Sequence, residues 1–294
     1  MINKYSLYGI DIDCDFPFPF LKPLKHSRNA NLIIKKDSRL RFSKKINFKD
    51  TISNLNLKSA TIENRFYKCK ITEGSLIRYK FKENQNNLSL LINFLHMPFA
   101  FVMFQKGYLP LHGMSFLNKN KSIIVSGATG SGKSSLCSTL SKTHKIKSED
   151  ITCIINRDNK NFSMPSFPIT LSEAAYSKHL KKFSSKKISR KRVINYLHDN
   201  YDDKKFVEVK KIYILEWGKE EFIRRLEDSE AFKKLLINSF KPYPFNSCLD
   251  SDSAYFKNIM GLIRCNEIYL YTRKKENNIS SHINLIKHLE NDSS

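Results

Sequence analysis

Residues 127–134 constrain this chain most, because they read Gly-Ala-Thr-Gly-Ser-Gly-Lys-Ser and match the whole pattern G-x-x-x-x-G-K-[ST]. The apolar run 123–125 before them predicts a strand, and Leu136 and Leu140 after them predict a helix. Glycines let the backbone curl between the two, so that successive N–H groups and the positive end of the helix converge on one anion. This glycine-rich loop (residues 127–134) is therefore expected to cradle the phosphates of a nucleotide.

The loop also predicts its cofactors, which are ATP and Mg2+. Lys133 is expected to reach the β- and γ-phosphates, and Ser134 to place its hydroxyl on the magnesium ion. The same pattern occurs in kinases, ATPases, GTPases and transporter motor domains, so residues outside the loop must decide between these classes. The other expected nucleotide contacts are Gly127, Ala128, Thr129, Gly130, Ser131, Gly132 and Ser135.

The bulk properties set wide limits. A length of 294 residues allows one elaborated domain or two small ones. The net charge of +23 predicts a surface that attracts anions such as nucleotides, acidic peptides, nucleic acid or anionic lipid. A coding bias toward lysine and asparagine would give the same composition without a selected partner, and both explanations stay open.

The cysteines and the first residues bear on the cellular compartment. The six cysteines are scattered and include no C-x-x-C pair, which predicts reduced thiols rather than a zinc site or disulfides. Asp11, Asp13 and Asp15 follow soon after the first residue, which leaves no apolar signal-peptide core. We therefore expect a cytoplasmic protein.

One segment, residues 88–108, is apolar enough to raise the question of a membrane span. It contains Asn93, His96, Pro98 and Gln105, which are costly in hydrocarbon or break a helix. The segment is therefore predicted to be a buried helix, and no membrane span is expected.

Three parts are predicted along the chain. Residues 1–85 form a β-rich portion packed on the core, with a hairpin turn at Glu73-Gly74 and an irregular packed loop at 16–20. Residues 86–273 form the core, and residues 274–294 form a polar tail that frays. Core strands are expected at 109–116, 122–125, 212–215 and 267–271, and core helices at 230–240 and 255–263.

Two carboxylates follow the loop earlier than in many nucleotide hydrolases, because Glu149 and Asp150 lie only 15 and 16 positions after Ser134. Together with Leu111-His112-Gly113-Met114 and the glycine-rich loop, they resemble the catalytic domain of the HPr serine kinase/phosphorylase family. In that family a His-Gly pair precedes the strand of the loop, and an Asp-Asp pair follows its helix at about this spacing.

The resemblance implies an α/β fold, with a P-loop kinase core of the HPr-kinase/PEP-carboxykinase type, a mixed sheet and a β-rich N-terminal portion. It implies transfer of the γ-phosphoryl group of ATP to a hydroxyl, with Ser or Thr of a peptide or small protein as the favoured acceptor. Glu149 is the expected base and Asp150 the expected magnesium ligand, although the exchanged roles fit almost as well. His112 is either close to the transferred phosphate or a core histidine. Further cations could come from Arg157, Arg190, Lys191 and Arg192.

Two departures from the family pattern motivate alternatives. Glu149 stands where the family has aspartate, and residues 165–170 stand where it has a glycine-rich, arginine-containing segment. One alternative is a nucleotide-binding regulatory module that has lost transfer activity. Another is a nucleic-acid-associated NTPase, suggested by the net charge. Against it, the sequence has no recognisable helicase or sensor motif, and the aromatic residues near the basic run 178–192 are too few for a base-stacking platform. An acidic partner and a homo-oligomer stay open.

Overall fold

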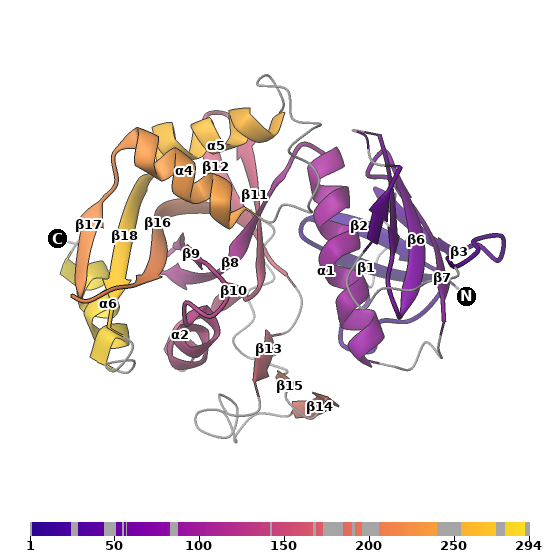
Figure 1. The fold of residues 1–294 in the computed structure, drawn as a ribbon, viewed down its shortest axis with the longest axis horizontal. Coiled ribbons are helices and arrows are strands. Elements are labelled where there is room, and N and C mark those ends of the chain that lie inside the picture. Colours follow the sequence, from indigo (N-terminus) through magenta and orange to yellow (C-terminus); the bar gives the residue numbers. More distant parts are fainter. Residues whose placement is uncertain are drawn as a thin grey trace. The chain divides into compact units, whose positions relative to one another are not determined.

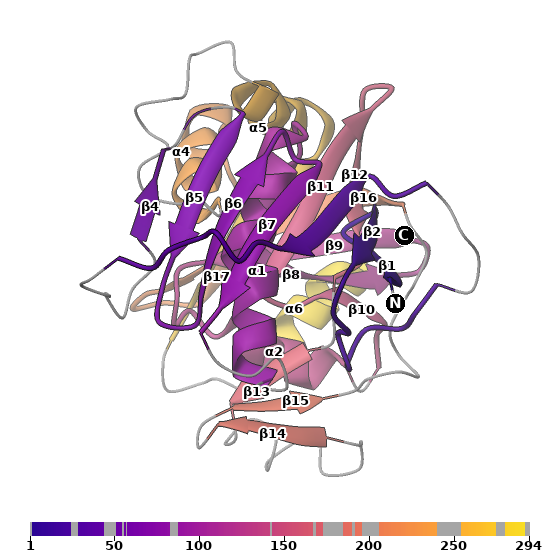
Figure 2. The same ribbon diagram turned by 90° about the vertical axis from the view of Figure 1, so that its right-hand side faces the viewer.

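A computed structural model describes residues 2–24, 29–43, 51–82 without 55 and 57, 88–166 without 142, 169–172, 185–189, 192–195, 206–239, 254–274 and 280–291. The chain divides into two compact units. The first comprises Met1–Pro110 and Phe240–Lys257, and the second comprises Leu111–Ser239 and Asn258–Ser294. The fold is mixed α/β, with a mixed sheet in each unit and few helices (Figures 1 and 2).

The first unit is built on a seven-stranded sheet of order β1-β2-β3-β7-β6-β5-β4. The pairs β2–β3 and β3–β7 are parallel, and the other neighbours are antiparallel. Its strands are β1 (Asn3–Leu7), β2 (Ile10–Cys14), β3 (Leu32–Lys36), β4 (Thr51–Ser53), β5 (Ser59–Glu63), β6 (Tyr67–Thr72) and β7 (Leu76–Phe81).

Two turns of this sheet bear on the sequence predictions. Glu73 and Gly74 connect β6 to β7 with φ of 51° and 61°, so the predicted hairpin turn is confirmed. Tyr8 and Gly9 have φ of 53° and 72° and form the turn between β1 and β2. Bulky residues such as tyrosine rarely adopt a positive φ, so the sequence does not indicate a turn at Tyr8.

The loop at residues 16–20 is irregular and buried, as predicted. Phe16, Phe18 and Phe20 are at most 3% exposed, and the Phe16 ring lies 5.0 Å from that of Tyr79. The backbone N–H of Phe18 donates to the hydroxyl of Tyr5 over 2.9 Å. The prolines between the phenylalanines prevent regular pairing, while the aromatic rings supply the apolar area that anchors the loop.

Helix α1 (Leu88–Gln105) forms as predicted and packs along one face of this sheet (Figure 1). It is long and apolar enough to cross a membrane by length and composition, but two thirds of it is buried within the protein. The ring of Phe94 lies 5.2 Å from that of Tyr67, and Gln105 accepts a 2.7 Å hydrogen bond from the backbone N–H of Gly74. These contacts are those of a core helix.

The second unit contains an eight-stranded sheet of order β10-β8-β11-β12-β16-β18-β17, in which β9 pairs with both β8 and β16. A separate three-stranded sheet has the order β13-β15-β14. The strands are β8 (Leu109–Asn118), β9 (Lys121–Gly127), β10 (Ile146–Ser148), β11 (Ile151–Arg157), β12 (Lys160–Met164), β13 (Ile169–Ser172), β14 (Ser185–Ser189), β15 (Arg192–Asn195), β16 (Val207–Trp217), β17 (Phe222–Arg225) and β18 (Glu267–Arg273).

Three adjacent strands of this sheet, β9, β16 and β18, run parallel and are largely buried. Figure 1 shows helices on both faces of these strands. On one face, α2 (Lys133–Leu140) and α6 (Ser280–Asn291) contribute Leu136, Leu285 and Leu289 to the main apolar core. On the other lie α4 (Asp228–Asn238) and α5 (Ala254–Cys265).

The C-terminal part differs from the sequence prediction. Residues 280–291, within the predicted polar tail, form helix α6, and its Leu285 and Leu289 are at most 4% exposed. Few apolar side chains, spaced on one face of the helix, suffice to hold it on the sheet. The predicted division of the chain into three parts, with boundaries at 85/86 and 273/274, stays a prediction. Most of the basic run 178–192 lies outside the described residues.

Candidate phosphate-binding site

The glycine-rich loop connects β9 to α2 at the carboxyl end of the parallel strands. Gly132 is the N-cap of α2 and has a φ of 91°, in the left-handed region that favours glycine. A Cβ added to Gly127 would lie 2.7 Å from the carbonyl oxygen of Leu215 on the neighbouring strand. The glycines therefore allow the backbone to turn sharply and close to β16, while Ala128, Thr129 and Gly130 remain exposed.

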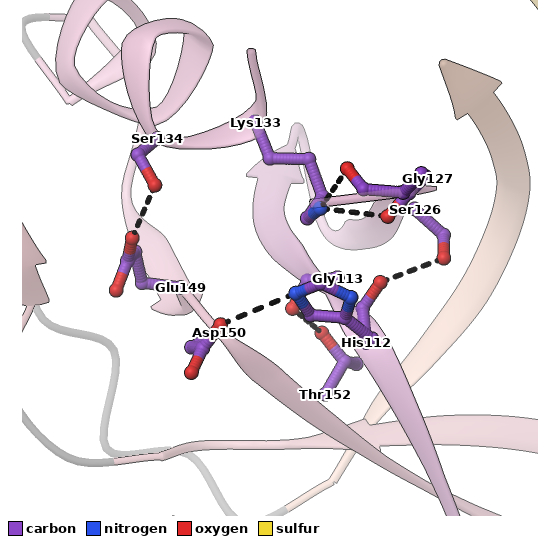
Figure 3. A network of polar contacts seen from close by, with 10 residues as sticks. His112, Gly113, Ser126, Gly127, Lys133, Ser134, Glu149, Asp150 and Thr152 are labelled. Carbon is purple, nitrogen blue, oxygen red and sulfur yellow. Dashed lines mark hydrogen bonds and ion pairs between the residues drawn. The ribbon is translucent and has the colours of Figure 1, made fainter. Parts of the chain in front are cut away.

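Lys133 folds back over the loop. Its Nζ donates hydrogen bonds to the carbonyl oxygens of Gly127 at 2.7 Å and Ala128 at 3.0 Å (Figure 3). The side chain is only 7% exposed, and burial lowers its pKa to about 8, while the charges of Asp150 and Glu149 act in the opposite direction. An anion at the loop would give this buried ammonium a charged partner in place of two neutral carbonyls.

Ser134 and Glu149 meet at the start of α2. The Ser134 hydroxyl donates a 2.8 Å hydrogen bond to Oε1 of Glu149, which lies in the turn between β10 and β11 (Figure 3). Ser134 is exposed, whereas Glu149 is 7% exposed. A hydroxyl and a carboxylate at hydrogen-bond distance are hard oxygen donors of the kind that bind Mg2+ beside substrate phosphates, so these two residues fit that ion.

Asp150 lies beside His112. Oδ1 of Asp150 lies 3.4 Å from Nε2 of His112 on β8, and both side chains are partly exposed (Figure 3). Hydrogen bonds to backbone carbonyls hold the same two residues in place. The N–H of Gly113 donates to the carbonyl of Asp150 at 3.1 Å, and the Ser126 hydroxyl donates to the carbonyl of His112 at 2.8 Å. The turn therefore directs its two adjacent carboxylates to different partners.

A buried chain of hydroxyls supports this turn from behind. The Thr152 hydroxyl donates to the carbonyl of Gly113 at 2.9 Å and lies 2.6 Å from the Ser148 hydroxyl. The Ser148 hydroxyl in turn lies 2.6 Å from that of Ser115. Because all three side chains are at most 1% exposed, they link β8, β10 and β11 in a place where unpaired hydroxyls would be costly.

Two residues that the sequence does not single out contact the loop from the carboxyl ends of β16 and β18. Nε1 of Trp217 donates to the carbonyl of Gly130 at 2.9 Å, and Nη2 of Arg273 donates to the carbonyl of Ser131. They lie 87 and 142 residues along the sequence from the loop residues that they contact, so no local sequence pattern predicts these contacts. The one available signal is that each lies two residues after a predicted core strand, 212–215 for Trp217 and 267–271 for Arg273.

The remaining candidates are away from this cluster or undescribed. Arg157 ends β11, at the opposite end of the strand from Asp150, and its guanidinium lies 4.2 Å from the ring centroid of Phe206. Ser135 is partly buried in α2, where its carbonyl accepts a 3.2 Å hydrogen bond from Thr139. Arg190 and Lys191 lie outside the described residues, and only the backbone of Arg192 is described.

Comparison with solved structures shows distant similarity to chains that include a kinase/phosphatase. The solved HPr(Ser) kinase/phosphatase from Coxiella burnetii matches with a TM-score of 0.34 and 10% sequence identity, over 63% of this chain and 99% of that one. No protein-family model and no curated protein matches the sequence.

Proposed function

We propose that this chain is an ATP-dependent phosphotransferase with a P-loop kinase core, which transfers the γ-phosphoryl group to a hydroxyl. The observation that carries the proposal is the arrangement of four side chains from two adjacent segments. Lys133 and Ser134 come from the glycine-rich loop and the start of α2, and Glu149 and Asp150 come from the β10–β11 turn. Together they offer a cation, a pair of hard oxygen donors and a separate carboxylate.

The proposal gives the loop the task of holding the triphosphate. The Lys133 ammonium leaves the carbonyls of Gly127 and Ala128 and binds phosphate oxygens, where it neutralises charge that develops during transfer. Ser134 and Glu149 would hold Mg2+, which when bound supplies further charge neutralisation on the phosphates.

The contacts favour the exchanged roles for the two carboxylates. Glu149 engages the serine expected to bind magnesium, whereas Asp150 is partly exposed and paired with His112. In the proposed step Asp150 takes the proton of the acceptor hydroxyl as that oxygen forms its bond to the γ-phosphorus, and the bond to the bridging oxygen of ADP breaks. His112 orients the carboxylate through its Nε2.

The proposed acceptor is a serine or threonine hydroxyl of a peptide or small protein in the cytoplasm. The net charge of +23 favours an acidic acceptor, because opposite charges speed the encounter and hold the substrate near the surface.

The test is transfer of label from γ-labelled ATP to a mixture of Ser- and Thr-containing peptides that includes acidic sequences. Wild-type protein with Mg2+ is expected to label peptide, and Asp150→Asn to bind ATP without labelling any. Nucleotide binding by the wild type with no labelled peptide and no self-labelling would contradict the kinase proposal and favour a regulatory nucleotide-binding module.

A further inference from the structure

The carboxyl ends of β9, β16 and β18 place three segments side by side. In the parallel register, Leu215 of β16 lies opposite both Gly127 of β9 and Tyr271 of β18. Two residues further on, Trp217 lies opposite Arg273. The next two strands of the sheet after β9 are β16 and β18, and they end at Trp217 and Arg273. Both residues therefore lie next to the glycine-rich loop, and Trp217 is the only tryptophan of the chain.

Trp217 and Arg273 contact consecutive peptide groups of that loop. The indole N–H donates to the carbonyl of Gly130 at 2.9 Å, and Nη2 of Arg273 donates to the carbonyl of Ser131. The two side chains also contact one another, with the guanidinium carbon 4.6 Å from the indole centroid. The pair thus acts as a single unit, which we call the outer clamp (Trp217 and Arg273).

Holding these carbonyls also orients N–H groups. The peptide unit is planar and trans, so its C=O and N–H point in opposite directions. Fixing the carbonyls of Gly130 and Ser131 therefore fixes the direction of the N–H groups of Ser131 and Gly132. The Ser131 N–H donates to the carbonyl of Ala128 at 3.0 Å, and the Gly132 N–H points away from Arg273. Backbone N–H groups of such a loop are the donors that a phosphate requires.

Arg273 is placed unusually for an arginine. Its side chain is fully buried, and among the described residues neither Nε nor Nη1 has a hydrogen-bond partner. Burial lowers its pKa from the ordinary value. The faces of Trp217 and Tyr271, 4.6 and 5.8 Å from the guanidinium carbon, offset part of the cost of burying this charge.

The backbone of the loop is shaped to accept this arginine. A Cβ added at Gly132 would lie 2.6 Å from Nη2 of Arg273, so any side chain there would displace the guanidinium. The Ser131 hydroxyl is also buried and has no hydrogen-bond partner among the described residues. Unpaired buried donors beside a loop suited to anions are costly features that binding of an anion can compensate.

We infer that the outer clamp, Trp217 and Arg273, positions the glycine-rich loop for the diphosphate part of a nucleotide. The two residues act through the backbone of Gly130 and Ser131. This inference rests on the proposed function only in so far as the loop binds nucleotide phosphates, and it holds whether or not transfer follows.

Three variants of the full-length protein test the clamp by calorimetric titration with Mg-ADP. Arg273→Met removes the donor and keeps the bulk, and is expected to weaken ADP binding about tenfold or more, as loss of a charged donor does. Arg273→Gln keeps an N–H donor without the charge, and is expected to restore part of that loss. Trp217→Phe keeps the ring without its N–H, and is expected to weaken binding by about fivefold.

Trp217 also supplies a spectroscopic readout, because it is the only tryptophan. Mg-ADP is expected to change its fluorescence in the wild type, and Arg273→Met to reduce that change. Arg224→Met is the matched control, since Arg224 on β17 is engaged with Glu230 at 2.7 and 2.9 Å, and ADP binding should be unchanged.

The outcomes separate the clamp from the kinase proposal. Wild-type ADP affinity in both Arg273→Met and Trp217→Phe would overturn the clamp, and so would an equal loss in Arg273→Gln and Arg273→Met. If Arg273→Met fails to fold, unchanged affinity in Trp217→Phe alone overturns it. Binding of ADP by the wild type without peptide labelling contradicts only the kinase activity, whereas absence of ADP binding contradicts both proposals.

Discussion

Oε1 of Glu149 accepts a hydrogen bond from the hydroxyl of Ser134 at 2.8 Å, while the adjacent Asp150 lies 3.4 Å from His112. Two neighbouring carboxylates therefore have different partners, one on the helix after the glycine-rich loop and one on β8. This division is possible because residues 149 and 150 lie between two strands rather than within one. It underlies the different tasks proposed for the two side chains.

The first prediction concerns Glu149→Gln. The amide keeps the shape but replaces a charged oxygen donor by a neutral one, so the gain in ATP affinity on adding Mg2+ should fall about tenfold or more. Titration of ATP with and without Mg2+ measures this gain, and the metal-free affinity serves as the control. A full magnesium effect in the variant would show that Glu149 does not serve the metal.

The second prediction concerns Asp150→Asn. An amide cannot take the acceptor's proton, so peptide labelling should fall by about 10²–10⁴-fold. Mg-ATP affinity should stay close to that of the wild type, because Asp150 is paired with His112 and not with Ser134. The opposite pattern, with transfer retained and magnesium dependence lost, would restore the roles first expected for the two carboxylates.

Sequence order decided which parts of this site could be predicted. The loop, its helix and the carboxylates lie within 24 residues of one another, so spacing alone brought them together. The outer clamp escaped prediction because Trp217 and Arg273 reach the loop only through the parallel pairing of β9, β16 and β18. Which strands become neighbours in a sheet is a property of the whole fold, and no short window of sequence contains it.

The fold shows the same contrast between local and non-local signals. Helix α1 and the β6–β7 hairpin were predicted because one carries a long apolar run and the other a turn at Glu73-Gly74. Helix α6 was missed because its segment is mostly polar and its stability comes from the packing of Leu285 and Leu289 against distant strands.

The third prediction concerns the hydroxyl chain. Thr152→Val removes the side-chain donor to the buried Gly113 carbonyl and one of the two hydroxyl partners of Ser148. The free energy of unfolding should fall by about 1–3 kcal/mol. Urea denaturation measures the change. Thr139→Val, at a partly exposed position of α2, is the matched control and should lower the free energy of unfolding much less. Equal effects would mean that the buried hydroxyls do not stabilise the turn between β10 and β11.

The fourth prediction uses the pKa of Lys133, lowered by burial to about 8 from an ordinary value of 10.5. Between these two pH values the folded protein holds fewer protons at this group than the unfolded chain does, so the contribution of Lys133 to stability rises with pH. This contribution is fully present above about pH 10.5 and is lost as the pH falls through about 8. The difference in unfolding free energy between wild type and Lys133→Met should follow that curve, with an amplitude of up to about 3 kcal/mol.

Nucleotide affinity should change with pH in the opposite direction. Phosphate oxygens bind the protonated ammonium, so above pH 8 the protein must take up a proton before it binds ATP. The affinity should therefore fall as the pH rises, approaching about tenfold per pH unit. Lys133→Met should bind more weakly and show no such slope, because the titrating group is gone. Calorimetric titrations at pH 7 to 10 in buffers of different ionisation enthalpy measure both the affinity and the proton uptake. Proton release on binding, or an equal slope in both proteins, would mean that Lys133 does not contact the phosphates.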